Sequence, residues 1–256
     1  MKPDERARLD RVLRPARLSA YASGEFVGQE GFMCATEILS LAVEAGIRPG
    51  ASVLDLCCGI AGPGRLLTRE LGCSYLGVDG SASAIAIARR HAGSTDCRFE
   101  VSRIPPVPSG PFDVVLLLET MLAFPDKKTL LHEIAGALRP GGRFAFTMEE
   151  GQPLTDAERA SIPNSDTVWL VPLPEMLSGL ERVGLHVRWQ EEVSRSHRNV
   201  VDSLADAFAA DSSDITASLG GRAFDELIVA HRCWGYWLRD GRVRKFAFVV
   251  EKARQS

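Results

Sequence analysis

Apolar residues fall into two patterns that alternate along most of the chain. Short, mostly apolar runs predict buried strands, and apolar residues three or four positions apart predict helices. The expected strands are 53–56, 75–79, 98–101, 112–119, 143–148 and 186–193, and the helices between them are 63–71, 81–91, 126–138 and 174–183. This alternation predicts an α/β domain whose largely parallel sheet carries helices on both faces.

The connection between the first strand and the first of these helices carries candidate chemistry. It is a glycine-rich turn, and Pro63 suits the first turn of the helix that follows. Glycines let a backbone approach a ligand closely, and a helix N-terminus leaves N–H groups free to meet it. Asp79 ends the second strand, where a carboxylate can accept both hydroxyls of a ribose. These features predict a nucleotide-type ligand.

Two further observations narrow the ligand. The chain has no Gly-x-x-x-x-Gly-Lys-Ser/Thr sequence, so a triphosphate has no cradle. Asp55 stands beside the glycine-rich turn, and its negative charge favours a cationic ligand over a phosphate.

Three blocks of sequence resemble class I S-adenosylmethionine methyltransferases, in family order and spacing. Segment 53–64 is similar to their Asp-x-Gly-x-Gly-x-Gly signature, Val78-Asp79 to their ribose-binding acid, and 138–143 to their turn into the fifth strand. The resemblance covers roughly residues 35 to 195 and extends to the ubiquinone-biosynthesis and glycine or phosphoethanolamine types. It implies S-adenosylmethionine as cofactor and S-adenosylhomocysteine as its product. Cys57 replaces the first signature glycine, which could crowd the methionine end of the cofactor.

The predicted fold is the Rossmann-like, seven-stranded sheet of that family, with the last strand antiparallel. One domain, 1–256, is expected, and its parts are an N-terminal helical cap (1–46), a cofactor-binding core (47–193), a helical lid inserted between the last two strands (194–241) and the last strand (242–256). The lid is expected because helical patterns at 199–210, 213–219 and 222–239 stand where a short hairpin would suffice to join antiparallel strands.

Composition sets the expected partners. A chain of 256 residues that is 45% hydrophobic can bury a large core, and a net charge of −3 without a basic run argues against nucleic acid. The six cysteines lack metal-ligand spacing, so no metal centre is expected. The chain shows neither a signal-peptide core nor a membrane span. A cytoplasmic protein with a small-molecule acceptor is therefore expected, and the oligomeric state stays open.

The resemblance assigns cofactor contacts to the ends of the first four strands. The expected residues are Asp55, Cys57, Gly59, Gly62, Asp79, Gly80, Ser102, Arg103, Ile104 and Glu119. Family members commonly carry an Asp that receives the adenine amino group, whereas Ser102 and Arg103 stand at that place here. Glu119 ends a buried strand and could lie beside the cofactor ammonium or the acceptor, or be a plain turn carboxylate.

Acceptor contacts are expected from the N-terminal cap, the fourth strand and the lid. The candidates are Tyr21, Phe32, Met121, Phe124, Trp169, Trp234 and Trp237. The two lid tryptophans could equally be core residues. Phe124 fills the approximate place of the catalytic His of the phosphoethanolamine enzymes, which argues against that acceptor.

The predicted function is methyl transfer to an oxygen or nitrogen atom of a small, partly apolar or aromatic metabolite. A hydroxyl acceptor would need a proton acceptor, and the candidate catalytic residues are His231, Glu149 and Tyr21. A neutral amine would need none. Transfer to carbon, and cofactor binding without methyl transfer, stay open as alternatives. An NAD-dependent oxidoreductase would share the glycine-rich turn and the second-strand acid.

Overall fold

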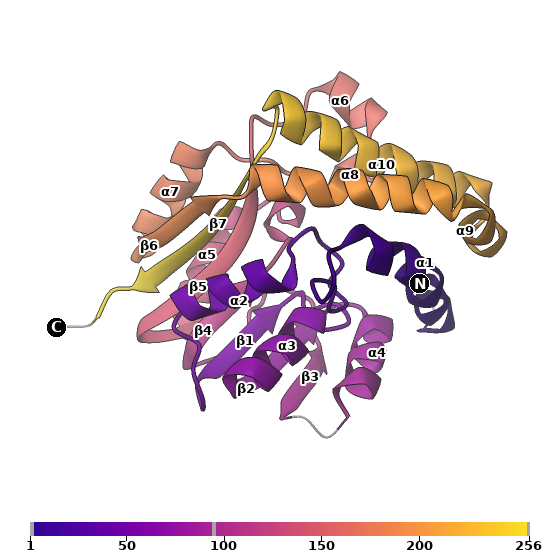
Figure 1. The fold of residues 1–256 in the computed structure, drawn as a ribbon. Helices are drawn as coiled ribbons and strands as arrows, with labels where there is room; N and C mark the ends of the chain where they lie inside the picture. Colours follow the sequence, from indigo (N-terminus) through magenta and orange to yellow (C-terminus); the bar gives the residue numbers. More distant parts are fainter. Residues whose placement is uncertain (1–2, 94–95, 255–256) are drawn as a thin grey trace.

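The strands form a mixed sheet in a computed structural model that describes residues 3–93 and 96–254 (Figure 1). Its order is β3-β2-β1-β4-β5-β7-β6. The strands are β1 (Ser52–Leu56), β2 (Ser74–Asp79), β3 (Cys97–Val101), β4 (Phe112–Leu117), β5 (Leu138–Glu150), β6 (Leu185–Glu192) and β7 (Arg244–Lys252). Strand β7 runs antiparallel to both of its neighbours. The predicted seven-stranded sheet with an antiparallel last strand is confirmed.

Helices cover both faces of the sheet. The helices α2 (Ala35–Glu44), α3 (Gly62–Leu71) and α4 (Ala82–Ala92) pack on one face, and α5 (Lys127–Ala137) and α7 (Leu173–Arg182) pack on the other (Figure 1). The central strands are therefore buried on both sides, which explains their continuous apolar sequences. Strand β5 starts five residues before the predicted 143, because Leu138 already pairs with Phe112 ahead of the irregularity at Gly141 and Gly142.

Three helices join β6 to β7, where the lid was predicted. They are α8 (Ser194–Ala210), α9 (Ser212–Leu219) and α10 (Gly221–Asp240), with α8 and α10 side by side (Figure 1). The N-terminal helix α1 (Pro3–Ala20) packs against α8 and α9. An apolar cluster centred on Leu13, Phe208 and Ile215 joins α1 to these helices. We call α8 to α10 the insertion.

Short elements complete the connections at the carboxyl edge of the sheet. The 3-10 turn η1 (Met121–Ala123) follows β4, and α6 (Asp156–Ser161) and η2 (Ser165–Thr167) lie between β5 and α7. An apolar cluster that includes Ile162, Val168 and Trp237 packs this connection against α10. In residues 3–93 and 96–254, none of the helices combines the length and the apolar character that a membrane crossing requires.

Candidate functional site

The turn between β1 and α3 has a left-handed backbone at alternate positions. The φ angles of Cys57, Gly59 and Ala61 are 58°, 56° and 58°. This conformation suits glycine and costs an L-residue about 1–2 kcal/mol. Asp79 secures the turn: its Oδ2 accepts from the Gly59 N–H at 2.9 Å and its Oδ1 from the Ser81 N–H at 2.8 Å. The strained turn is therefore held by the acid that ends β2.

The end of β3 lies beside Asp79 at the same edge of the sheet. The Ser102 N–H donates to the backbone oxygen of Asp79 at 3.0 Å, and a Cβ on Gly80 would lie 3.3 Å from Cγ of Arg103. Ile104 packs beside the core on the α5 side of the sheet. The structure thus brings together the residues that the sequence assigned to the ribose and adenine end of a cofactor.

Residues 21–34, which we call the N-terminal segment, lie over the turn. A Cβ on Gly62 would come within 2.5 Å of the Gly28 carbonyl carbon, so this contact requires a glycine at 62. The Tyr21 hydroxyl donates to the Gly31 oxygen at 2.8 Å. Gln29 Nε2 donates to the oxygens of Glu25 and Met33, at 2.9 and 2.8 Å. These bonds fix the segment against the sheet.

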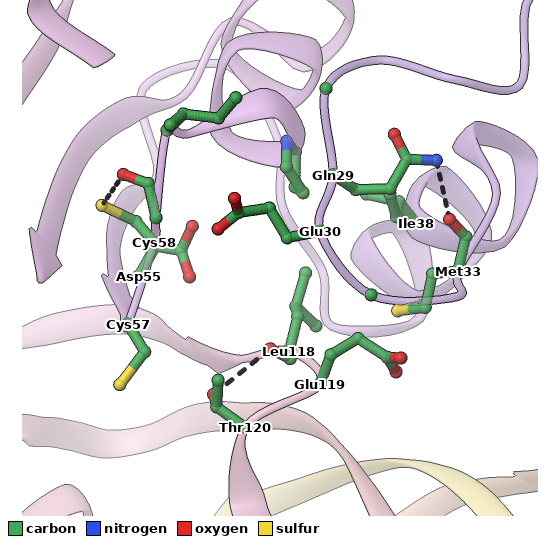
Figure 2. Close-up of a pocket in the computed structure, with 15 residues that line it drawn as sticks. Gln29, Glu30, Met33, Ile38, Asp55, Cys57, Cys58, Leu118, Glu119 and Thr120 are labelled. Atoms are coloured by element: carbon green, nitrogen blue, oxygen red, sulfur yellow. Dashed lines mark hydrogen bonds between the residues drawn. The ribbon is translucent and has the colours of Figure 1, made fainter. Parts of the chain in front are cut away.

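A cavity of about 170 Å³ separates the turn from the N-terminal segment, and we call it the loop cavity. It is lined by Gly28, Gln29, Glu30, Gly31, Met33, Ile38, Asp55, Cys57, Cys58, Gly59, Ile60, Pro63, Leu118, Glu119 and Thr120. Figure 2 shows the Glu30 carboxylate projecting from the segment into the space in front of Asp55 and Cys58. Carboxylates therefore reach this cavity from both sides.

The Asp55 carboxyl is buried beneath the turn. Burial raises its pKa to about 7, against the opposing hydrogen bond from the Tyr75 hydroxyl, which reaches Oδ2 at 2.5 Å. Burial likewise raises the pKa of the Cys57 thiol to about 12, so this side chain is uncharged at neutral pH. Asp55 is thus the group in the loop cavity whose charge is set to change near neutrality.

Glu119 follows β4 with a φ angle of 61°, and its carboxylate is satisfied on both oxygens. Oε2 accepts from the Phe32 N–H at 2.9 Å, and Oε1 accepts from the Thr147 hydroxyl at 2.9 Å and from Lys245 Nζ at 2.9 Å. Burial alone would raise the pKa of Glu119, but the attraction of Lys245 and of His197 and the Phe32 hydrogen bond outweigh it and lower the pKa. Glu119 is therefore ionised, and its contacts connect the N-terminal segment to β5 and β7, which a carboxylate that served only its own turn would not do.

Lys245 connects Glu119 to a second carboxylate. Its Nζ also donates to Glu149 Oε1, and Glu149 stands directly opposite Lys245 in the pairing of β5 with β7. The lysine side chain is only 2% exposed. Burial would lower its pKa, but the attraction of Glu119 and Glu149 outweighs burial and raises it. Lys245 is thus a buried ammonium held between two carboxylates.

A second cavity, of about 230 Å³, adjoins this group beneath α10, and we call it the lid cavity. It is lined by Glu30, Gly31, Phe32, Glu119, Leu122, Glu149, Ile162, Pro163, Asn164, Thr167, Val168, Trp234, Leu238 and Lys245. Glu30, Gly31 and Glu119 line the loop cavity as well. The two cavities therefore share a wall at the carboxyl end of β4.

The predicted catalytic residues differ in their access to these cavities. Glu149 lines the lid cavity. His231 packs edge-on against Phe32 and Phe208, and its Nδ1 lies 2.8 Å from the Leu227 oxygen. Burial lowers the pKa of His231, so its ring is neutral at pH 7, with Phe32 standing at the cavity wall in front of it. Burial and the charge of Glu119 raise the pKa of Tyr21, whose hydroxyl is engaged by Gly31.

Some of the predicted acceptor residues line the lid cavity and others do not. Phe32 and Trp234 line the lid cavity. Met121 and Phe124 are buried in the core on the α5 side, because η1 turns back onto the sheet, and Trp237 is only 5% exposed in the cluster beneath α10. Trp169 is 40% exposed and stacks with the Arg159 guanidinium, 5.0 Å from the ring centroid. These four side chains lie outside the lid cavity.

Sequence reasoning missed Lys245 and His197. The alternation of side chains along β7 could have revealed Lys245. Phe246, Phe248 and Val250 point to one buried face of the sheet, so Lys245 must point to the other face. His197 is fully buried in α8, with Nε2 3.5 Å from Glu37 and Nδ1 3.9 Å from Glu119. Its surrounding sequence is polar, so no local pattern marked it as buried.

Comparison with known proteins agrees with this geometry. A model of a methyltransferase domain matches residues 53–142. Phosphoethanolamine N-methyltransferase 3 of Arabidopsis thaliana is 32% identical over 40% of this chain and 21% of its own length. The sterol 24-C-methyltransferase ERG6 of Saccharomyces cerevisiae is 32% identical over 41% of this chain and 29% of its own length. The match therefore spans less than a third of each of these two relatives.

Among solved structures, the cyclopropane synthase MmaA2 of Mycobacterium tuberculosis has the same fold. The TM-score is 0.79 at 15% identity, covering 96% of this chain and 94% of that one. The matched segment 53–142 contains the strained turn and Glu119, which line the loop cavity, and Asp79, which accepts a hydrogen bond from the turn. From these matches, residues 53–142 belong to a methyltransferase domain, and the sheet order and the turn are those of the class I S-adenosylmethionine-dependent fold.

Proposed function

We propose that this protein transfers the methyl group of S-adenosylmethionine to an oxygen or nitrogen atom of a small metabolite with an apolar or aromatic part. The observation that carries the proposal is the wall of Glu30, Gly31 and Glu119 shared by two cavities. One cavity is bounded by the turn that resembles the family's cofactor signature, and the other has a largely apolar lining. A cofactor in the first and an acceptor in the second would meet at this wall.

The loop cavity suits the cofactor in charge. Asp55, Glu30 and Glu119 line it, and carboxylates favour a ligand with an ammonium and a sulfonium. A Cβ on Gly59 would lie 3.0 Å from Glu30 Oε2, so the glycine lets this carboxylate approach the turn. Asp79 ends β2 beside the turn, the strand-end place at which such folds carry a ribose-binding acid.

S-adenosylmethionine supplies an already activated methyl group, so the chain's own residues have three tasks. They hold the acceptor atom in line at about 3 Å, exclude water and accept a proton where the acceptor carries one. Trp234 and Leu238 of α10 roof the lid cavity and shield it from solvent. Of the three predicted bases, Glu149 is the one that lines this cavity, and it would serve a hydroxyl acceptor.

Transfer to carbon is the second candidate. The lid cavity includes Leu122, Ile162 and Val168, a lining that also fits a hydrocarbon acceptor, and one relative is named a sterol C-methyltransferase. Product analysis separates the two, because methylated carbon, oxygen and nitrogen give different fragments in mass spectrometry.

The test begins with binding. Calorimetry of the purified protein with S-adenosylhomocysteine should show one site per chain, and incubation with methyl-labelled S-adenosylmethionine and a panel of small aromatic amines, alcohols and unsaturated lipids should yield a labelled product. Absence of S-adenosylhomocysteine binding would overturn the proposal. Binding without labelled product across the panel would favour a cofactor-binding protein that transfers no methyl group.

A further inference from the structure

The lid cavity has an excess of negative charge at one end. Of the described residues that line it, Glu30, Glu119 and Glu149 are acidic and Lys245 is basic. Lys245 is paired with both Glu119 and Glu149, so one ammonium serves two carboxylates. Buried charges are normally paired, since an uncompensated charge in a low dielectric is costly. Within this trio two carboxylates share one ammonium, and His197 Nδ1, 3.9 Å from Glu119 Oε2, and the more distant Lys127 are the other basic groups near them.

One oxygen in this group has no partner. Glu149 is 7% exposed, its Oε1 accepts from Lys245, and Oε2 is buried with no hydrogen bond from the part of the chain that the structure describes. An ionised carboxylate oxygen can only accept hydrogen bonds, so the missing partner must be a donor. Leaving such an oxygen unsatisfied is unfavourable, and a ligand that donates to it would bind in preference to one that does not.

The position of this oxygen is set by the sheet and by Lys245 together. Glu149 and Lys245 face each other across β5 and β7, so backbone pairing holds both side chains at the same level of the sheet. Lys245 occupies Oε1 and leaves Oε2 as the one remaining site on this carboxylate. Lys245 is therefore a positioning residue for Glu149.

The rest of the cavity selects for an apolar body. Phe32, Leu122, Val168, Trp234 and Leu238 line it, and its volume of about 230 Å³ admits one ring with a short chain. A ligand that satisfies both ends has a cationic or N–H-bearing head and an aromatic or branched apolar body.

We propose that the acceptor is an amine with a ring-sized apolar body, bound in the lid cavity with its N–H donating to Glu149 Oε2, and that the amine nitrogen receives the methyl group. This rests on the proposed function. The neutral amine forms the new N–C bond with its lone pair while the C–S bond breaks, and the electron pair of that bond goes to sulfur. The positive charge moves from sulfur to nitrogen, and the product ammonium then releases a proton to water.

The charge count favours nitrogen over oxygen. An amine acquires the positive charge during transfer, and the carboxylates of Glu119 and Glu149, which share the Lys245 ammonium, stabilise a positive charge that develops beside them. A phenolate or carboxylate acceptor would bring a second negative charge to the same place and be repelled. A neutral alcohol can donate a hydrogen bond to Glu149 Oε2, but the negative charge of the carboxylates adds no electrostatic attraction to its binding.

The test compares three probes of one shape, 2-phenylethylamine, 2-phenylethanol and phenylacetate, with the protein saturated with S-adenosylhomocysteine at pH 7.5. The amine is then protonated and sulfur is neutral, as after transfer. The amine should bind about tenfold or more tighter than the alcohol, as expected for a charge-assisted hydrogen bond, and the acid should not bind. Glu149→Gln should remove the preference and leave S-adenosylhomocysteine affinity unchanged.

Glu150→Gln is the matched control. Glu150 is the next residue of β5, its carboxylate pairs with Arg244 at 2.9 Å, and it lines neither cavity, so the amine preference should persist in this variant. Equal binding of amine and alcohol, binding of none of the three, or a preference that survives Glu149→Gln would each overturn the inference. In all three cases intact S-adenosylhomocysteine binding would leave the proposed function standing, whereas its loss in the wild type would overturn both.

Discussion

Replacing Lys245 by Met tests the central feature of the site, the ammonium between two carboxylates. The side chains of Lys245, Glu119 and Glu149 are 2%, 13% and 7% exposed, so solvent screens their interactions little. Met fills a similar volume and removes the charge, which leaves two carboxylates buried without their cation. Breaking a buried pair in this way costs about 3–5 kcal/mol.

That loss converts to a large thermal shift. For a domain of this size, 1 kcal/mol corresponds to about 2–4 °C in Tm, so Lys245→Met should melt roughly 6–20 °C below the wild type at pH 8. Lys252→Met is the control in the same strand. Lys252 Nζ donates to the backbone oxygens of Ala135 and Leu138, at 2.6 and 2.7 Å, and its loss strands no carboxylate.

The pH dependence gives the sharper test. In the wild type the pKa of Glu119 is lowered on folding, so its contribution to stability is present above its usual pKa of 4.5 and is lost as pH falls below that value. In Lys245→Met the ammonium no longer offsets the burial of Glu119, so this carboxylate binds a proton more readily when folded than when unfolded and the variant loses stability as pH rises. The effect in the variant makes the difference in unfolding free energy between the two proteins narrow from pH 8 to pH 5, whereas the wild-type effect acts below that range.

Urea denaturation between pH 5 and pH 8 measures the difference in unfolding free energy between the wild type and Lys245→Met directly. The raised pKa of Lys245 places its own titration above 10.5, outside the range, so it does not interfere. An unchanged Tm in Lys245→Met, or a difference that stays constant between pH 5 and pH 8, would refute the argument. Lys252→Met should show a smaller, pH-independent loss.

Four other predictions follow from the site. Asp79→Ala removes the anchor of Gly59 as well as the expected ribose partner, so S-adenosylhomocysteine affinity measured by calorimetry should fall by about 1.5–3 kcal/mol, and an unchanged affinity would contradict this assignment. Gly62→Val should displace the N-terminal segment from the turn, with faster proteolysis of residues 21–34 and weaker S-adenosylhomocysteine binding, while circular dichroism shows the sheet intact. Trp237→Ala should cost about 3–5 kcal/mol of stability because its ring is core, whereas Trp234→Ala should cost less and raise the acceptor KM; equal melting temperatures would argue against this division. Asp55, with a pKa of about 7, should lose its proton when the cationic cofactor binds, so S-adenosylmethionine affinity should rise from pH 6 to pH 8 and the binding enthalpy should depend on the buffer.

The sequence predicted the fold well because the features that specify it are local. Strands buried on both faces have continuous apolar sequences, and the glycine-rich turn lies within a few residues of the strand that positions it. The insertion was predicted for the same reason, since α10 repeats apolar residues at helical spacing. The start of α8 was placed five residues late because its first turns, 194–198, are polar in sequence although His197 is buried.

The lid cavity was only partly predictable because it depends on pairing between distant segments. Glu149 and Trp234 were named from their places at a strand end and on a helix, but their relation to Lys245 follows only from the register of β5 with β7. The contact of Gly31 with Glu119, where a Cβ would lie 2.2 Å from Cγ, likewise joins residues 88 positions apart in number. Met121 and Phe124 illustrate the converse, since adjacency to a strand end did not decide which way the 3-10 turn would face.

The two cavities differ in which parts of the chain supply their linings. Apart from the N-terminal segment and Ile38, the residues around the loop cavity lie between Asp55 and Thr120, within the segment that matches the methyltransferase domain. The lid cavity adds residues from β5, the connection after it, α10 and β7, all beyond that segment. Substitutions in α10 can therefore change the shape of the lid cavity without altering the turn.

Glu119 is the exception, because it lines both cavities and is bonded to the N-terminal segment, β5 and β7 at once. A change at Glu119 should accordingly affect cofactor and acceptor together, whereas a change at Glu149 or Trp234 should affect the acceptor alone.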